Sequence, residues 1–426
     1  METEIVTKEV VSSPEAFFAT VAGRPGSVWL DSTLRFDDRG HNSFVAGDPQ
    51  IDVALHENRV QVRKSGEAVQ VLPGRDIWDE LSGLWESRQY FSVGYISYEA
   101  MLPFVGVTPS VYGSIPSVRF LFFDRAQKFD HTESVGANSI DDAVDQSGGE
   151  CLIQTSRADY IERIRAIKDH IREGDIYQAN FTTRIDVNSD APPFDVYRRL
   201  RRLNPAPYSA YLDFGDYQIL STSPERMFLK EGGRISTGPI KGTIAASDDP
   251  MANDYSRRRL LESDKDRAEL LMIVDLERND LGRIARTGTV EVERLFKTET
   301  YSSLIHLVSD ISAELRNDVR LKDIVATLMP GGSITGAPKK RAVEIIADME
   351  TLPRSVYTGC IGYVDGDKAD FNIAIRTMIH AGGQYQVHAG GGIVADSDPD
   401  SEYDEMLLKA RNLLKSLGVQ QEETVC

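Results

Sequence analysis

The chain has 426 residues, of which 41% are hydrophobic and 27% charged, and its formal net charge at pH 7 is −18. This composition is typical of a soluble protein with enough apolar material for a large core. The negative charge disfavours nucleic-acid binding, because phosphate backbones would be repelled. No apolar run approaches the ~20 residues that a membrane helix requires, so we expect no membrane association.

The amino terminus and the cysteines indicate a reducing compartment. Met1–Glu4 is acidic, whereas a signal peptide would begin with basic residues. Cys151, Cys360 and Cys426 are far apart in the sequence and fit neither a disulfide framework nor a zinc site. We therefore expect a cytoplasmic, enzyme-sized protein.

Residues 1–123 contain short β-like runs separated by turn residues, which predict an amino-terminal β-rich lobe. The runs are Ser27–Leu30, Asn42–Ala46, Val60–Arg63, Tyr90–Tyr95 and Val118–Phe123. Residues 124–150 are polar and contain a pair of glycines, Gly148 and Gly149. This stretch is predicted to be a linker or loop.

Residues 151–426 alternate helical periodicity with extended segments, which predicts an α/β (α+β) region. The predicted helices are Arg157–Glu173, Arg257–Arg283, Leu321–Leu328, Arg341–Met349 and Ser401–Leu417, and the extended segments include Tyr217–Ser221 and Tyr363–Ile379. Nearly all the unusual motifs lie in this region.

Lys241 stands in the constrained segment Pro239–Thr243, shortly after the charged turn Ser223–Arg226. Its amine is a candidate nucleophile, but at an ordinary pKa of about 10.4 only about one lysine in two thousand is neutral at pH 7. A working nucleophile therefore requires burial or a cationic neighbour. The alternative is a surface lysine in a turn.

Two acidic helices are candidates for a metal site. Glu269 lies among apolar residues in one predicted helix, and Glu402, Glu405 and Lys409 share one face of another. Mg²⁺ prefers one or two carboxylates together with water and substrate oxygens. The alternative is an ordinary solvated acidic face, which is the commoner origin of such a pattern.

Two glycine clusters and one arginine suggest anion binding. Pro330–Arg341 leads into the predicted helix and differs from a P-loop, because Ala337-Pro338 replaces the required Lys-Ser/Thr. Ala389–Ser397 contains three glycines, which let a backbone approach a ligand closely. Structural turns are the alternative for both clusters. Arg376 lies in an alternating strand pattern and implies either an anionic ligand or an internal salt bridge.

Together these segments resemble the chorismate-utilising enzymes, which include anthranilate, aminodeoxychorismate, isochorismate and salicylate synthases. The resemblance extends from about Ser156 to Gly418, and it implies a large fold of two β-sheets packed together with surrounding helices. The matching segments are Gly174–Asn180, Ser223–Arg226, Pro239–Thr243, Lys265–Gly282, His306–Ser309, Pro330–Lys339, Ile375–Thr377 and Gly390–Glu405.

Two positions divide this family. The isochorismate and salicylate branch has a water-activating lysine where this chain has Gln178, and anthranilate synthases usually have alanine where it has Lys241. The chain is therefore most similar to the aminodeoxychorismate synthase branch, which converts chorismate and ammonia to 4-amino-4-deoxychorismate for 4-aminobenzoate and folate. Anthranilate synthase component I is the main alternative, and a catalytically silent chorismate-binding subunit is another.

The resemblance also implies roles for individual residues. Mg²⁺ would be held by Glu269 and Glu405, with Glu402 close by. Lys241 would attack the ring, Glu225 would act as general acid, and His306 would lie near the pyruvyl group or simply pack in the core. The implied substrate contacts are Arg376, Gly390, Gly391, Gly392, Thr335, Tyr357, Lys409 and Gln178.

Ammonia is expected from a separate glutamine amidotransferase subunit. The segment around Cys360 lacks the downstream His-Gln and His-x-Glu of a glutaminase, so Cys360 is predicted to be a buried strand residue. The resemblance further implies a tryptophan pocket beginning near Leu30–Ser32.

Overall fold

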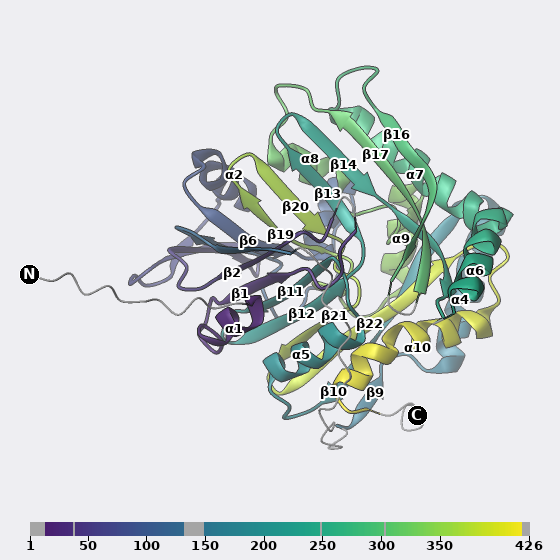
Figure 1. Cartoon of the computed structure of the whole chain (residues 1–426), viewed down its shortest axis with the longest axis horizontal. Helices are drawn as coiled ribbons and strands as arrows, with labels where there is room; N and C mark the ends of the chain where they lie inside the picture. Colours follow the sequence, from purple (N-terminus) through teal and green to yellow (C-terminus); the bar gives the residue numbers. More distant parts are fainter. Residues whose placement is uncertain (1–12, 37–38, 132–148, 248, 302–303, 420–426) are drawn as a thin grey trace, which may run out of the picture.

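The computed structural model describes residues 13–36, 39–131, 149–247, 249–301 and 304–419. Within these ranges the strands form two antiparallel sheets, one of ten strands and one of twelve, and helices cover the outer face of each sheet (Figure 1). The predicted α/β class and the packing of two sheets with surrounding helices are confirmed.

The first sheet carries one edge of the candidate site. In spatial order its strands are β18 (Gly336–Ala337), β10 (Gln178–Asn188), β22 (Gln384–Ile393), β21 (Thr377–Ala381), β12 (Tyr217–Ser223), β11 (Tyr208–Asp213), β1 (Val28–Asp31), β2 (Asn42–Ala46) and β8 (Gln127–Asp130), and β9 (Cys151–Ile153) also pairs with β10.

The second sheet carries the opposite edge of the site. Its strands are β15 (Ile240–Ala245), β17 (Leu304–Glu314), β14 (Arg234–Gly238), β13 (Arg226–Glu231), β20 (Lys368–Asn372), β19 (Cys360–Asp365), β6 (Phe91–Ile96), β7 (Val118–Phe123), β3 (Ile51–His56), β4 (Arg59–Lys64) and β5 (Gln70–Leu72), and β16 (Glu291–Thr300) pairs with β17.

Helices close the molecule on both sides of the sheets. They are α1 (Pro14–Ala19), α2 (Ile77–Ser87), α3 (Tyr98–Met101), the 3₁₀ turn η1 (Leu102–Val105), α4 (Arg157–Glu173), α5 (Pro193–Leu203), α6 (Pro250–Glu262), α7 (Asp264–Ile284), α8 (Leu321–Leu328), α9 (Lys339–Met349) and α10 (Pro399–Ser416). None of these described helices combines the length and apolarity needed to cross a bilayer.

Three apolar clusters hold these layers together. One joins α1, α4, α5 and α10 to the first sheet, and a second joins α2, α7 and α8 to the second sheet. Between the sheets, Val93 and Leu121 of the second sheet pack with Ala210 and Ile219 of the first. Burial of this apolar surface is the main stabilising contribution to such a fold.

Strands from residues 1–123 belong to both sheets. β1 pairs with β11, and β6 pairs with β19, so early strands continue the sheets of the later region. The predicted boundary at residues 124–150 therefore does not separate one sheet from the other. That stretch was predicted to be a linker, but its first part forms β8, and residues 132–148 lie outside the described ranges.

Two predicted elements are broken in the structure. The helix expected over Arg257–Arg283 is two helices, because Ser263 adopts an extended backbone and its hydroxyl caps the start of α7. The extended segment expected over Tyr363–Ile379 is β19, β20 and β21, separated by a turn and a bend.

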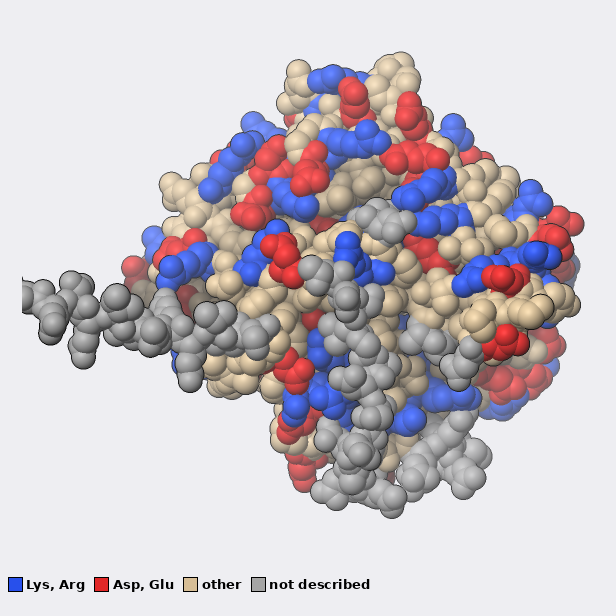
Figure 2. Space-filling model, viewed as in Figure 1, with Lys and Arg blue, Asp and Glu red and all other residues tan. Residues whose placement is uncertain are grey.

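Basic and acidic side chains are interspersed over the face shown in Figure 2.

Candidate active site

Lys241 lies on β15 at a β-bulge rather than in a turn. The register with β17 shifts between Lys241 and Thr243, so Gly242 is the extra residue. Gly242 has a φ of +67°, and a Cβ there would lie 3.0 Å from the Asp266 side chain on α7. Glycine therefore lets the strand pass close to the helix. The alternative of a surface lysine in a turn is wrong.

The Lys241 amine points into a group of acidic residues. Its Nζ donates a hydrogen bond to the Ser333 carbonyl at 3.1 Å. Burial lowers the pKa of this amine below its usual value, against the opposing charges of Glu225 and Glu269. Burial thus enlarges the neutral fraction that a nucleophile requires.

Glu225 lies between β12 and β13, beside Lys241. Its residue is 4% exposed, and its Oε1 accepts a hydrogen bond from the Ile240 N–H at 3.4 Å. The backbone N–H of Glu225 donates to Ser223 Oγ at 3.2 Å, which fixes the turn. Burial raises the pKa of the Glu225 carboxyl, so this group holds a proton to higher pH than an exposed glutamate.

The two acidic helices meet near Lys241. Burial raises the pKa of Glu269 on α7 and of Glu402 on α10, whereas the ammonium of Lys409 holds the pKa of Glu405 below its usual value. Lys409 is 2.7 Å from Glu405 and also donates to the Gly390 carbonyl at 3.1 Å. The predicted acidic faces therefore come together with a partly compensating cation.

These three carboxylates suit a hard cation but do not enclose one. Their oxygens do not all lie within 4.8 Å of one another, and the described group that meets this distance is His170, Glu173 and Asp175, at the end of α4. There Asp175 is already paired with Arg341 at 2.7 Å. Because Mg²⁺ needs only one or two carboxylates, the α7–α10 set fits it as an open site.

The glycines at 390–392 lie in β22, opposite β10, and not in a turn. A Cβ at Gly391 would lie 3.1 Å from Glu402 Oε2, and one at Gly392 would lie 2.7 Å from Gln178 Nε2. The glycines therefore let this strand lie directly against the acidic helix on one side and Gln178 on the other.

Gln178 begins β10 and is fully buried. Neither its amide nitrogen nor its amide oxygen has a hydrogen-bond partner. Buried amides without partners are uncommon, because the lost hydration costs free energy. This side chain is therefore suited to hydrogen-bond a polar ligand in the cleft.

Arg376 lies in the bend before β21 and not within the strand that its sequence pattern predicted. It has a φ of +50°, and its Nη1 donates to Asn204 Oδ1 at 2.8 Å. Among the described residues no carboxylate forms an ion pair with it, so the alternative of an internal salt bridge is not found there. Burial lowers its pKa, and its charge is available to an anion.

His306 lies on β17 and is 5% exposed. Its Nδ1 is 2.9 Å from the Thr243 hydroxyl. Burial, with the charge of Arg376, lowers its pKa to about 3. The imidazole is therefore neutral at physiological pH and faces the same cleft as Arg376.

Tyr357 and Thr335 line the remaining side of the site. The Tyr357 ring stacks on His388 with centroids 5.3 Å apart, and burial raises its pKa to about 12. Thr335 is fully buried, and its hydroxyl donates to the Gly331 carbonyl at 2.7 Å. The latter hydroxyl therefore stabilises its own loop.

Two site residues were missed in the sequence. Lys265 lies in the first turn of α7, and its charge opposes the burial that raises the pKa of Glu269 and Glu402. It stands in Lys265–Gly282, one of the segments that carried the family resemblance, so its positive charge in an acidic helix could have identified it. Asn204, the partner of Arg376, follows α5 and no nearby pattern marks it.

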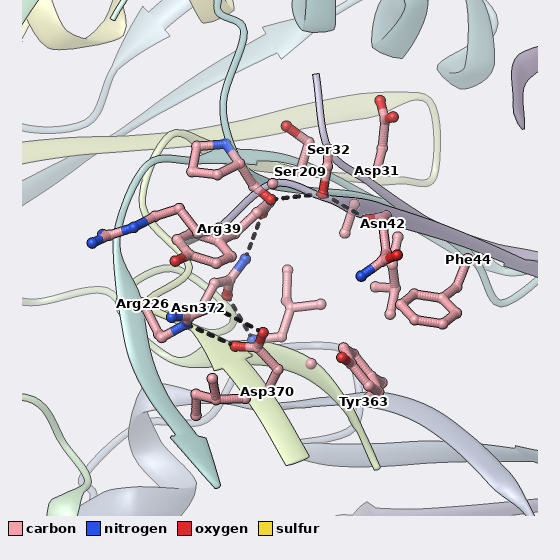
Figure 3. A pocket seen from close by; sticks show the side chains of 18 of the residues that line it. Asp31, Ser32, Arg39, Asn42, Phe44, Ser209, Arg226, Tyr363, Asp370 and Asn372 are labelled. Atoms are coloured by element: carbon pink, nitrogen blue, oxygen red, sulfur yellow. Dashed lines mark hydrogen bonds and ion pairs between the residues drawn. The ribbon is translucent and has the colours of Figure 1, made fainter. Parts of the chain in front are cut away.

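A second cavity, of about 200 Å³, lies away from these residues (Figure 3). It is lined by Leu30–Ser32, where the resemblance implies the start of a tryptophan pocket. Arg226 forms an ion pair with Asp370 at 3.1 Å across one wall, and Tyr363 and Phe44 form another. None of the candidate catalytic residues lines it.

Known proteins resemble this chain over different lengths. Anthranilate synthase component 1 1 of Haloarcula marismortui is 43% identical over 263 residues, which are 62% of this chain and 54% of that protein. Aminodeoxychorismate synthase component 1 of Salmonella typhimurium is 44% identical over 263 residues, which are 62% of this chain and 58% of that protein. The matches thus span little more than half of these relatives.

The fold comparison covers nearly the whole chain. The crystal structure of anthranilate synthase component I from Streptococcus pneumoniae TIGR4 superposes with a TM-score of 0.78 and 27% identity, over 97% of this chain and 100% of that one. The sequence profile described as chorismate binding enzyme matches residues 32–415. The chain belongs to the chorismate-binding enzyme family.

Proposed function

We propose that the chain is the chorismate-converting component of an aminodeoxychorismate synthase. It combines chorismate with ammonia to give 4-amino-4-deoxychorismate, the precursor of 4-aminobenzoate in cytoplasmic folate synthesis. The observation that carries the proposal is the Lys241 amine, whose pKa burial lowers beside Glu225. An alanine at this position would have favoured an anthranilate synthase.

Substrate binding follows from the charges around the cleft. Arg376 takes one carboxylate of chorismate, because no described side chain neutralises it, and the unpartnered amide of Gln178 hydrogen-bonds a ring substituent. Glu269 and Glu405 would hold Mg²⁺, with Glu402 adjacent, and the ion would supply positive charge for the other carboxylate of the substrate. Lys409, Tyr357, Thr335 and the 390–392 strand complete the walls.

The chain's residues then divide the reaction into two displacements. The neutral Lys241 Nζ forms a bond to C2 of the ring as the C4–O bond breaks, and Glu225 gives its proton to the departing hydroxyl, which leaves as water. Ammonia next bonds to C4 as the C2–N bond to Lys241 breaks and the double bonds return, and the extra proton of the new C4 ammonium passes to the Glu225 carboxylate. The neutral His306 lies beside the pyruvyl group and does not exchange a proton.

Ammonia comes from a separate glutamine amidotransferase subunit. Cys360 begins β19 and is fully buried, and burial raises the pKa of its thiol. A buried neutral thiol is a poor nucleophile for glutamine hydrolysis. High concentrations of ammonium salt should replace the partner in vitro.

Product identification tests this proposal. The protein is incubated with chorismate, Mg²⁺ and excess ammonium, and the product is analysed by mass and fluorescence. We expect a product that retains the pyruvyl carbons and is not anthranilate. Fluorescent anthranilate would establish the alternative that the 43% identical anthranilate synthase suggests, and no turnover would favour a silent binding subunit.

A further inference from the structure

Arg354 is the most completely bonded charged side chain near the site. It follows α9, its residue is 1% exposed, and its Nε and Nη2 donate to the two oxygens of Glu350, each at 2.7 Å. Its remaining acceptors are the Ile334 carbonyl at 3.0 Å, the Thr358 hydroxyl at 3.2 Å and the Asn180 carbonyl at 2.6 Å. Its five N–H donors therefore meet five acceptors.

Each of the last three acceptors adjoins a residue of the candidate site. Ile334 stands between Ser333, which accepts from Lys241, and Thr335. Thr358 follows Tyr357, and the Tyr357 N–H donates to the Arg354 carbonyl at 3.1 Å. Asn180 lies on β10, on the strand that begins with Gln178. One guanidinium thus joins the three segments that carry these candidate site residues.

We propose that Arg354 is a positioning residue, which fixes the Ser333–Thr335 loop, the Tyr357 turn and the start of β10 in one arrangement for chorismate binding. The role in substrate binding rests on the proposed function. The role in placing the Ser333 carbonyl against the Lys241 amine does not depend on the proposed function, because that contact is present in the structure.

The geometry requires arginine rather than a generic cation. The planar guanidinium presents donors in several fixed directions, whereas a lysine ammonium has three donors at one point. The Arg354 Cζ also lies 4.4 Å from the centroid of the Tyr98 ring, and its own N–H donates to Glu99 Oε1 at 2.7 Å. Arg354→Lys would keep the charge and lose the connections between the segments.

Arg119 provides a matched control. It is likewise an arginine with a bidentate carboxylate, at 3.0 and 2.8 Å from Asp52, and its Cζ lies 4.6 Å from the centroid of the Phe214 ring. None of these contacts is with a candidate site residue. Arg119→Lys and Arg354→Lys should both lower the midpoint of thermal unfolding.

Two measurements on the full chain separate positioning from stability. Steady-state kinetics with chorismate should show kcat/KM reduced on the order of 100-fold in Arg354→Lys, with KM raised, because small displacements of binding groups have such effects. Competitive acetylation of Lys241 across pH, followed by mass spectrometry, should show its titration midpoint shifted from the wild-type value, because the Ser333 carbonyl that accepts from the amine is displaced. Arg119→Lys should change neither.

The inference is overturned if Arg354→Lys keeps the wild-type KM and Lys241 midpoint while losing only stability. Should that variant fail to fold, Thr358→Val decides, because it removes one acceptor and keeps the side-chain shape. A severalfold rise in KM or a shifted midpoint supports the inference, and wild-type values overturn it. If wild-type protein turns over no chorismate, the proposed function fails and the Lys241 midpoint still tests Arg354.

Discussion

The candidate active site and the second cavity differ in how their arginine and amide side chains are paired. In the candidate active site, the amide of Gln178 has no partner, and Arg376 bonds only an uncharged amide among the described residues. In the second cavity, Arg226 is paired with Asp370, and both ends of the Asn372 amide are bonded (Figure 3).

This difference distinguishes polar side chains that a bound ligand could satisfy from polar side chains whose existing contacts stabilise the fold. Leaving a buried polar group without a partner costs free energy that a bound ligand can recover. A paired group already has its compensation and stabilises the protein when left intact. Substitutions of the unpaired groups in the candidate active site should therefore change function, and substitutions of the paired groups in the second cavity should change stability.

Lys241→Ala should have the largest effect. Loss of the nucleophile should lower kcat on the order of 1000-fold or more, with the midpoint of thermal unfolding little changed. The matched change in the second cavity is Asp370→Asn, which leaves the Arg226 guanidinium without its carboxylate. It should cost about 3 kcal/mol of unfolding free energy and keep kcat. This distinction would be contradicted if Lys241→Ala lowered stability and kept kcat while Asp370→Asn lowered kcat and kept stability.

Glu269→Gln and Glu405→Gln should abolish magnesium-dependent turnover, since each would remove a charged oxygen that the proposal assigns to the metal. Titration calorimetry with Mg²⁺ and chorismate present provides a second readout. Glu173→Gln, in the other acidic group near α4, should leave the magnesium dependence unchanged. Full activity of both α7 and α10 variants would remove these residues from the metal site.

The pH dependence should follow Lys241 and Glu225. Below the optimum, kcat/KM rises with pH as Lys241 loses its proton, and above it the value falls as Glu225 loses its own. Burial lowers the first pKa and raises the second, which brings both limbs toward neutral pH. Glu225→Gln should lower activity and remove the alkaline fall. Persistence of that fall would assign it to another group.

Gln178→Leu should have the smallest overall effect of these changes, and its effect on stability should have an unusual sign. Because both amide atoms are buried without partners, removing them should raise the unfolding free energy by about 1 kcal/mol while raising KM. Asn372→Leu, in the second cavity, should instead lower the unfolding free energy by about 1–3 kcal/mol. It would leave the Ile361 N–H and the Tyr208 carbonyl without their hydrogen-bond partner. The comparison would be contradicted if denaturant titrations showed the unfolding free energy changing in the same direction in both variants.

Periodicity predicted the regular elements well. The helices over Arg157–Glu173 and Leu321–Leu328 and the strands over Asn42–Ala46 and Val118–Phe123 have the predicted bounds. Each of these has its own local pattern. The break at Ser263 was missed because the apolar repeat continues across it, although serine is a common N-cap.

The site was predicted less completely, because its parts meet only through the fold. The acidic residues and Lys241 were identified by type and spacing. The strand conformation of Gly390–Gly392 and the bend at Arg376 depend on pairing with β10 and on Asn204, which no local pattern specifies. Of the contacts of Arg354, those with the Ile334 and Asn180 carbonyls likewise join segments that are distant in sequence.

The most direct test of the account is intact-protein mass spectrometry after chorismate is added with Mg²⁺ but without ammonia. Because no second nucleophile is present, the account predicts a covalent adduct on Lys241 with the mass of chorismate less water, absent in Lys241→Ala. The same adduct yield in the alanine variant would contradict the proposed role of this lysine.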